Sequence, residues 1–389
     1  MPMTSESPLL SEPTTDAPRK KMGKGAKLLL IVGINLGLLL FTTEVVLRIA
    51  RPDAVSENQL MPAFLKAQSG RRGMAHPYLA FIPRPNWESP PTFDHVTTHN
   101  SWGFRGPEVE IEKPEDVFRI VCLGGSSTYG HTPSRDETTW PAQLQTILNE
   151  RQDIKRVEVI NGGFSGYNSF ESLANFNFRL LPFDPDLVIV YHTINDARCT
   201  LYKNTATYDN THWRSVWPIY SPTPTEKLFE TSMTYLIYRR YLTDYISGMG
   251  DMGEWGIVDY DPDANDVWKV GPKTKIGFQN FQRNLESIHA SAAARGIQMV
   301  VASQGCDRTD FPGNGAIQFG ALDRNETILR KVAAAKELLF VEGREALDNA
   351  AKAEGVDTVY THEVHLTDRG CEVLATAFAK ALLQSGAIQ

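Results

Sequence analysis

From residue 118 to the C-terminus, short apolar runs alternate with longer segments whose apolar residues recur at helical spacing. The short runs are rich in β-branched residues and predict strands; they lie at 118–123, 157–160, 187–191, 299–302 and 339–342. The longer segments predict helices; they lie at 140–150, 169–181, 276–295, 321–338 and 367–383. Nearly continuous apolar strands that are separated by helices indicate a parallel sheet covered on both faces.

One stretch, at about 197–274, breaks this alternation directly after a predicted strand. It is rich in aromatic residues, namely Trp213, Trp217, Tyr235, Tyr238, Tyr241, Tyr245, Trp255 and Trp268. Ligands of open α/β sheets bind at the carboxyl ends of the strands, so this insertion could form a lid or a wall of a substrate site. Equally, the aromatic side chains could pack the insertion's own small core.

The N-terminal part of the chain has the pattern of a membrane helix. Residues 1–27 are polar and end in five basic residues, and an apolar run with one acid, Glu44, follows at 28–48. About twenty apolar residues suffice to cross a hydrocarbon core of about 30 Å. The basic lead-in places the N-terminus in the cytoplasm and the rest of the chain outside, with Glu44 near the outer interface. A cleaved signal peptide and a buried helix are the alternatives, although no small-residue cleavage motif follows the run.

Residues 49–117 contain many prolines and few long apolar runs. We interpret them as a stalk and an N-terminal extension that lies against the domain formed by 118–389. Within the extension, residues 100–106 (NSWGFRG) predict an ordered turn.

Composition narrows the range of partners. The 389 residues carry a net charge of −7 and a pI of about 5.8, which argues against binding nucleic acid. The four cysteines are too few for a disulfide scaffold, and no CxxC pair suggests zinc. Cys199 and Cys306 each follow a predicted strand end, so a disulfide between them is conceivable, but connectivity does not follow from sequence.

Four short blocks that can carry chemistry each follow a predicted strand or precede the last helix. In the first, glycines before Ser126 allow a tight strand-to-helix turn that exposes the hydroxyl. In the second, a glycine such as Gly166 could present its backbone N–H to an oxyanion, and in the third the Asn195 amide could do the same. In the fourth, His365 can return to the serine as a general base. Each block alone also fits a purely structural interpretation, such as a glycine-rich turn or a helix cap.

Other chemistries fit the chain poorly. Neither GxGxxG nor GK[ST] is present, so phosphate binding by a glycine loop is poorly supported. The segment HEVH at 362–365 lacks the HExxH spacing of zinc proteases, and a lone pair of histidines is a weak metal site. We expect no metal and no organic cofactor.

Taken in order, the four blocks resemble the SGNH (GDSL-like) hydrolase family: a GDS-like block, N-x-x-x-x-G, G-x-N-D and D-x-x-H. The resemblance covers about 118–385, and residues 100–106 look like the lead-in of membrane-anchored bacterial members. It implies a flavodoxin-like α/β/α sandwich. It also implies that Ser126 is the nucleophile, that the N–H groups of Ser126 and Gly166 and the Asn195 side chain form the oxyanion hole, and that His365 is the general base.

The chain departs from the family pattern at three positions. Gly125 stands in place of the GDS aspartate, and Thr193 in place of the glycine of G-x-N-D. The family's triad acid lies three residues before the histidine, where this chain has His362. The adjacent Glu363 is the candidate acid; without it, the resemblance leaves a Ser–His dyad.

The resemblance therefore implies a membrane-anchored serine esterase that forms an acyl-enzyme on Ser126. Its substrates would be acylated small molecules, O-acetylated glycans or lipid esters. Two alternatives stay open: an O-acyltransferase that acts on exported polysaccharide, and an inactive protein that keeps the fold for binding or as a scaffold. The oligomeric state does not follow from the sequence.

Overall fold

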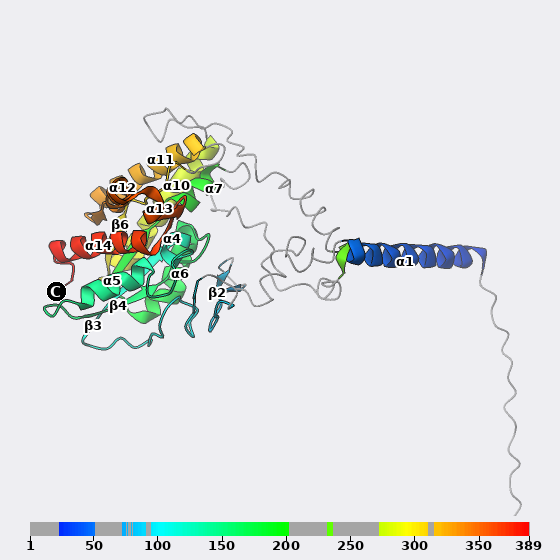
Figure 1. The fold of residues 1–389 in the computed structure, drawn as a ribbon, viewed down its shortest axis with the longest axis horizontal. Coiled ribbons are helices and arrows are strands. Elements are labelled where there is room, and N and C mark those ends of the chain that lie inside the picture. Colours follow the sequence, from blue (N-terminus) through cyan, green and yellow to red (C-terminus); the bar gives the residue numbers. More distant parts are fainter. Residues whose placement is uncertain are drawn as a thin grey trace, which may run out of the picture.

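The computed structural model describes residues 23–50, 72–74, 76, 79, 81–90, 95–201, 232–235, 272–309 and 315–388. These residues form a helix near the N-terminus, α1, and an α/β body in which helices surround a central sheet (Figure 1). All the aromatic residues that we singled out in the insertion, Tyr235 excepted, lie outside the described residues.

The central sheet has five parallel strands in the order β4-β3-β5-β6-β7. Their bounds are β3 Val117–Gly124, β4 Arg156–Asn161, β5 Leu187–Tyr191, β6 Gln298–Ala302 and β7 Leu339–Val341. Because the chain adds strands first on one side of β3 and then on the other, the order is that of flavodoxin-like folds, 2-1-3-4-5. The predicted fold class, a three-layer α/β/α sandwich, is confirmed.

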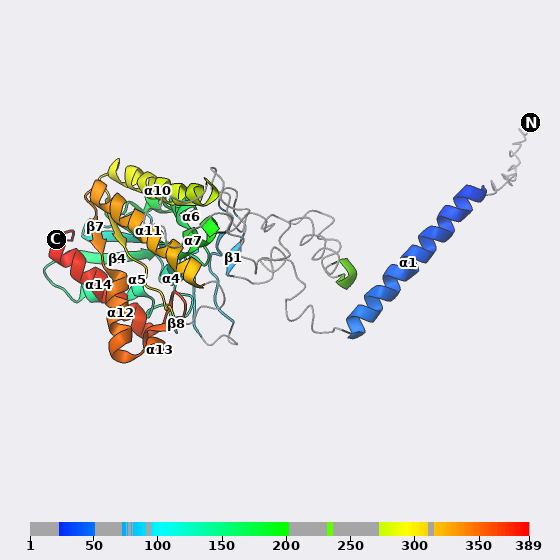
Figure 2. The ribbon, with the colours of Figure 1, turned by 90° about the horizontal axis from the view of Figure 1, so that it is seen from above.

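Helices cover both faces of the sheet (Figure 2). One face is packed by α5 (Trp140–Asn149), α12 (Gly343–Glu354) and α14 (Asp368–Ser385). The other is packed mainly by α10 (Pro272–Ala293) and α11 (Gly315–Ala335). Successive residues of a strand point to opposite faces of the sheet. Because helices cover both faces, the residues on both sides of β3 and β5 are apolar, and these strands are continuous hydrophobic runs in the sequence.

Two shorter helices follow strand ends, and a small hairpin precedes α14. α6 (Ser169–Asn175) begins with a capping box in which Asn168 and Glu171 bond each other's backbone N–H groups. α7 (Ile194–Leu201) follows β5, and the hairpin β8 (Tyr360–His362) and β9 (His365–Leu366) follows the four-residue helix α13 (Val356–Val359). The predicted helix 169–181 is helical throughout, but its type changes: after α6 the chain continues as a π-helix, Phe176–Leu180, and a 3-10 turn, Leu181–Phe183.

The N-terminal extension packs onto the sheet edge through the predicted turn at 100–106. Asn100 Oδ1 accepts hydrogen bonds from the backbone N–H groups of Trp102 and Phe104, which closes the turn. Gly103 has φ +87°, and a Cβ there would collide with the carbonyl group of Pro83, so only glycine fits. Arg105 is buried, pairs with Asp136 at 2.6 Å and forms a bridge with Asn161 at the end of β4.

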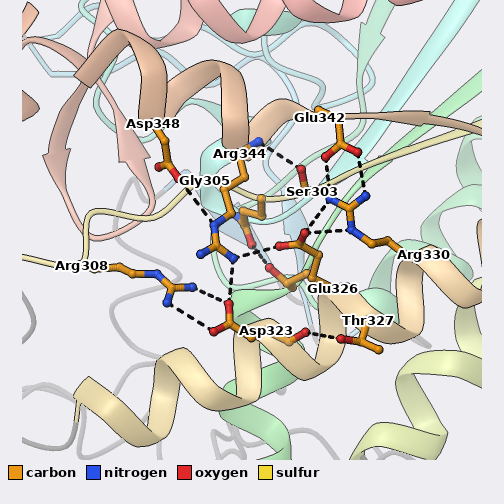
Figure 3. Close-up of polar contacts among 12 residues, drawn as sticks. Ser303, Gly305, Arg308, Asp323, Glu326, Thr327, Arg330, Glu342, Arg344 and Asp348 are labelled. Atoms are coloured by element: carbon orange, nitrogen blue, oxygen red, sulfur yellow. Dashed lines mark hydrogen bonds and ion pairs between the residues drawn. The ribbon is translucent and has the colours of Figure 1, made fainter. Parts of the chain in front are cut away.

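An ion-pair network ties α11 to α12 (Figure 3). Arg344, at the start of α12, bonds Asp323 at 2.8 Å and Glu326 at 3.0 Å on α11. Arg330 joins Glu326 to Glu342. The Arg344 side chain is 28% exposed, so this network is screened less than isolated surface pairs.

α1 (Lys24–Ala50) has 27 residues and none of them is buried. Among the described residues it is the one helix long and apolar enough to cross a membrane, although a signal sequence near an N-terminus would pass the same test. Glu44, in its last two turns, accepts hydrogen bonds from the backbone N–H groups of Met233 and Thr234 and from the Ser232 hydroxyl. The described part of the insertion therefore touches the end of this helix.

Candidate active site

Ser126 stands at the carboxyl end of the central strand. β3 ends at Gly124, and Ser126 begins the short helix α4 (Ser126–Tyr129). A Cβ at Gly125 would lie 2.7 Å from Asn195 Nδ2 and 3.1 Å from the Tyr167 carbonyl oxygen. Glycine at 125 thus lets the serine turn, the Asn195 amide and the loop after β4 approach one another closely.

His365 reaches Ser126 from the hairpin β8–β9. Its Nε2 atom lies 2.8 Å from Ser126 Oγ, across 239 positions of sequence. The hairpin is held in place on both sides of the histidine, because Ser127 Oγ donates to the Val364 carbonyl at 2.8 Å and Thr132 Oγ1 donates to the Leu366 carbonyl at 2.7 Å. A serine hydroxyl at this distance from an imidazole can pass its proton to it.

Among the described residues, none bonds the other ring nitrogen of His365. If the serine hydroxyl donates to Nε2, the neutral ring carries its proton on Nδ1. Nδ1 is buried and makes no hydrogen bond. An unmet buried donor costs about 1–3 kcal/mol, so the site lacks the acceptor that would hold this tautomer.

Glu363 does not supply that acceptor in this structure. It occupies the hairpin turn with φ +47°, and its carboxylate pairs with Arg198 at 2.6 Å. Its carbonyl accepts from the Asp307 N–H at 2.7 Å, which fixes the turn from the backbone side. The ring nearest to His365 is that of His362, with 4.4 Å between the centroids and planes tilted by 48°.

The candidate oxyanion donors lie around the serine turn. Among the described residues, the N–H groups of Ser126 and Gly166 donate to no other protein group. Gly166 has φ +80°, a conformation that glycine adopts readily. Asn195 Nδ2 donates one hydrogen bond to the Tyr167 carbonyl at 2.8 Å, so its second N–H is available.

Thr193, which replaces a glycine of the family pattern, connects the blocks. Its hydroxyl donates to Gln304 Oε1 at 2.8 Å, and Gln304 Nε2 donates to Ser127 Oγ at 3.2 Å. Since Ser127 in turn donates to the Val364 carbonyl, one chain of hydrogen bonds runs from the end of β5 to the histidine hairpin. Sequence reasoning missed Gln304, which follows β6 and carries no local pattern.

Basic groups surround the catalytic pair, and sequence reasoning missed most of them. The His131 ring lies 5.3 Å from that of His365, and its Nδ1 accepts from Arg72 Nη1 at 2.9 Å. Burial lowers the pKa of His365 to about 3, and His131, His362, Arg198 and Arg72 lower it further. Burial also lowers the pKa of His131 to about 4, with Arg72 as the next cause. Of this group, the sequence analysis had noted only His362, as the residue at the position of the family's acid.

Behind the oxyanion residues lies a buried polar cluster. Asp196 accepts from the Ser169 hydroxyl at 2.5 Å and from its N–H at 3.1 Å, and Asn284 Nδ2 donates to the same hydroxyl. Burial raises the pKa of Asp196 to about 7. The neighbouring His192 is neutral, since burial lowers its pKa to about 3. This cluster anchors the start of α7, which carries Asn195.

The two cysteines that could have paired are not joined. Cys199 Sγ accepts from Asn168 Nδ2 at 3.2 Å, and Cys306 Sγ donates to the Asp307 carbonyl at 3.5 Å. In the part of the chain that the structure describes, no group of three or more His, Cys, Asp or Glu side chains has the arrangement of a metal site.

Residues 122–237 match the model of the GDSL-like Lipase/Acylhydrolase family. Solved structures with similar folds include LAE5, an alpha/beta hydrolase enzyme from the metagenome of Lake Arreo, Spain (16% identity, 68% of this chain, 94% of that chain, TM-score 0.42). They also include the lipase/acylhydrolase from Enterococcus faecalis (15%, 70% and 97%, TM-score 0.41) and a catalytic mutant of Axe2, an acetylxylan esterase from Geobacillus stearothermophilus (13%, 68% and 94%, TM-score 0.43). A search of curated proteins finds no match.

Proposed function

We propose that this chain, whose residues 122–237 match the model of the GDSL-like Lipase/Acylhydrolase family, is a membrane-anchored serine esterase with Ser126 as nucleophile and His365 as general base. The observation that carries the proposal is the 2.8 Å contact between Ser126 Oγ and His365 Nε2 at the carboxyl edge of the sheet. Two residues so distant in sequence are brought together here by separate elements, each held by its own hydrogen bonds.

The reaction proceeds by acyl transfer. Ser126 Oγ attacks the ester carbonyl carbon while His365 Nε2 takes the hydroxyl proton. The bond from the carbonyl carbon to the alcohol oxygen then breaks, and His365 returns the proton to the departing alkoxide. Water next attacks the acyl-serine with His365 again as base, which releases the carboxylic acid and restores the serine.

The negative charge of the tetrahedral intermediate needs donors. The N–H groups of Ser126 and Gly166 and the second N–H of Asn195 are the groups we assign to it. Removing one such donor typically costs about 10²–10³-fold in kcat, or ~2.7–4 kcal/mol. This assignment is supported by the two uncommitted backbone N–H groups and by the close approach of the Asn195 amide to Gly125.

We also propose that α1 is retained as a membrane anchor, with the catalytic domain on the outer side. The five basic residues before the helix support this orientation, and a helix with no buried side chain fits a lipid environment. The organisation would then be a cytoplasmic tail at 1–27, a membrane helix at 28–48, a stalk and extension at 49–117, and a catalytic domain at 118–389. Intact mass measurement on membrane-extracted protein tests retention, because a cleaved signal peptide would remove residues 28–48.

The activity is tested with full-length protein in an uncharged detergent. We would measure hydrolysis of p-nitrophenyl acetate, butyrate and octanoate by the wild type and by the Ser126→Ala and His365→Ala variants. A Ser287→Ala variant is the matched control, since that serine is half-buried on α10 and its hydroxyl donates to the Arg283 carbonyl in the preceding turn. We expect turnover by the wild type and the control and background rates for both site variants.

The preferred chain length then separates an acetylesterase from an enzyme acting on lipid esters. If the wild type is as slow as Ser126→Ala on all three esters, the esterase proposal fails. A burst of one p-nitrophenol per enzyme without further turnover would instead identify an acyltransferase that waits for its own alcohol acceptor.

A further inference from the structure

Four basic side chains lie near the catalytic pair. The rings of His362 and His131 flank that of His365, with centroids 4.4 Å and 5.3 Å away. Arg72, from the N-terminal extension, bonds His131 at 2.9 Å. Arg198, from α7, bonds the Glu363 carboxylate in the same hairpin as His365. All four side chains are half-buried, so part of each remains exposed.

Two carboxylates near the catalytic pair already form ion pairs with arginines. Glu363 pairs with Arg198 at 2.6 Å, and Asp136 pairs with Arg105 at 2.6 Å. No carboxylate of the described residues pairs with Arg72, whose guanidinium lies over the Tyr129 ring, 5.5 Å from its centroid. The chain as a whole has a net charge of −7, so the local excess of positive charge does not follow from composition.

This local charge acts on the histidine in a definite direction. Apart from burial, the leading causes that lower the pKa of His365 are all basic groups: His131, His362, Arg198 and Arg72. The Arg72 guanidinium, which pairs with no carboxylate of the described residues, opposes the imidazolium that must form as Ser126 loses its proton, and it favours any anion bound beside it. In such a site an anion on the substrate would offset the charge that the protein leaves unbalanced.

We propose, resting on the esterase function above, that the natural substrate is an ester bearing a carboxylate or phosphate group close to the scissile bond, and that Arg72, with His131 and His362, binds this anion. Arg72 offers a planar set of donors that suits both groups. The bound anion stabilises the imidazolium of His365 in the transition state, in the place where a protein carboxylate is lacking.

The experiment compares three O-acetylated sugars on the full-length protein in uncharged detergent: a methyl glucoside, a methyl glucuronide and a methyl glucoside 6-phosphate. The quantity measured is kcat/KM for acetate release. We expect at least one anionic sugar to exceed the neutral one by ~10-fold or more, and the ratio to fall as salt is added. The two anionic sugars distinguish a carboxylate site from a phosphate site.

The variants connect the preference to Arg72. In Arg72→Gln the ratio of anionic to neutral kcat/KM should fall to near one, and Arg72→Lys should restore part of it. Arg295→Gln removes the same charge from the turn just after α10, where the Arg295 side chain donates to the Ser291 carbonyl, and should leave the ratio unchanged. A wild-type ratio near one, or a ratio that Arg72→Gln does not lower, overturns the inference.

Failure of the esterase proposal is seen separately. Ser126-dependent hydrolysis of the neutral sugar without any anionic preference would keep the esterase and remove the inference. If no sugar is hydrolysed, binding of methyl glucuronide and methyl glucoside 6-phosphate to full-length Ser126→Ala is measured by calorimetry. Binding that is lost with Arg72→Gln supports the anion site without any catalysis, and no binding of either anion overturns it.

Discussion

Replacing His362 by aspartate tests what the unpartnered nitrogen of His365 means for catalysis. Nδ1 of His365 is buried without a partner, and the His362 ring lies beside the His365 ring. An aspartate oxygen lies about as far from the backbone as Nδ1 of the imidazole it replaces, and it could accept the Nδ1 proton of His365. We therefore expect His362→Asp to hydrolyse p-nitrophenyl acetate faster than the wild type.

The size of the gain follows from the separation of the two groups. Two unit charges about 4 Å apart attract by ~4 kcal/mol at an effective dielectric constant of about 20. His362 and His365 are both half-buried, so solvent screening reduces this to ~1.5–3 kcal/mol, the range of hydrogen bonds to charged groups. Since ~1.4 kcal/mol is a factor of ten in rate, kcat/KM should rise by ~10- to 100-fold.

The same substitution should move the pH profile. The general base must be deprotonated, and burial lowers the pKa of His365 to about 3, with His362 among the further causes. The wild-type rate should therefore fall only at low pH. Removing one imidazole and adding a carboxylate both raise the pKa of His365, so the acid limb should move upward by ~1–2 pH units while the plateau rises.

The assay is kcat/KM against pH for the full-length wild type, His362→Asp and His362→Asn. The asparagine variant has nearly the same shape as the aspartate variant without its charge, and it should gain much less. If the aspartate variant is no faster than the asparagine variant and its acid limb stays in place, Nδ1 does not face position 362 and our account of the missing acid is wrong.

Three further predictions concern the surroundings of the site. Burial raises the pKa of Asp196 to about 7 from 3.8, so the folded chain keeps a proton that the unfolded chain releases, and stability falls as pH rises between these values. Asp196→Asn should remove this slope and raise the urea-unfolding free energy by ~2–4 kcal/mol above neutral pH. Arg344→Ala should lower the unfolding free energy by ~1–2 kcal/mol, less so in high salt, whereas Arg151→Ala, at a fully exposed pair, should give no measurable change. Gly125→Ala should displace the Asn195 amide and lower kcat by ~100-fold or more, with the circular dichroism spectrum unchanged.

The strands could be predicted from the sequence because a strand that is buried on both faces is a continuous apolar run. The apolar run 187–191 has the same bounds as β5, and its five residues are all buried. The same reasoning predicted the helix at 169–181 but not its type, since the chain widens into a π-helix at Phe176–Leu180 and then enters a 3-10 turn that contains Pro182. The hydrogen-bond partner of each N–H changes there, and periodicity of side chains does not report it.

Residues of the candidate site could be predicted from the sequence only where they lie beside a strand end. Ser126, Gly166 and Asn195 follow the strands β3, β4 and β5, and topology then places them at one edge. The partner of Glu363 could not be read in this way, because its carboxylate is fixed by Arg198 from another element and its own backbone lies at φ +47°. No sequence pattern predicts the position of Arg72, since only tertiary packing brings the extension to His131.

The absence of an acid beside His365 and the presence of basic side chains around it act on the same charge, that of the His365 imidazolium. A carboxylate at position 362 would stabilise the imidazolium of His365 for every substrate, but it would also cancel part of the positive charge that favours an anionic one. His362→Asp should therefore affect two kinds of substrate unequally: kcat/KM should rise for an acetylated methyl glucoside and should rise less, or fall, for the acetylated glucuronide or 6-phosphate. The ratio of anionic to neutral kcat/KM should drop by ~10-fold or more. If His362→Asp raises kcat/KM equally for both substrates, His362 only takes the place of an acid and does not contribute to substrate specificity.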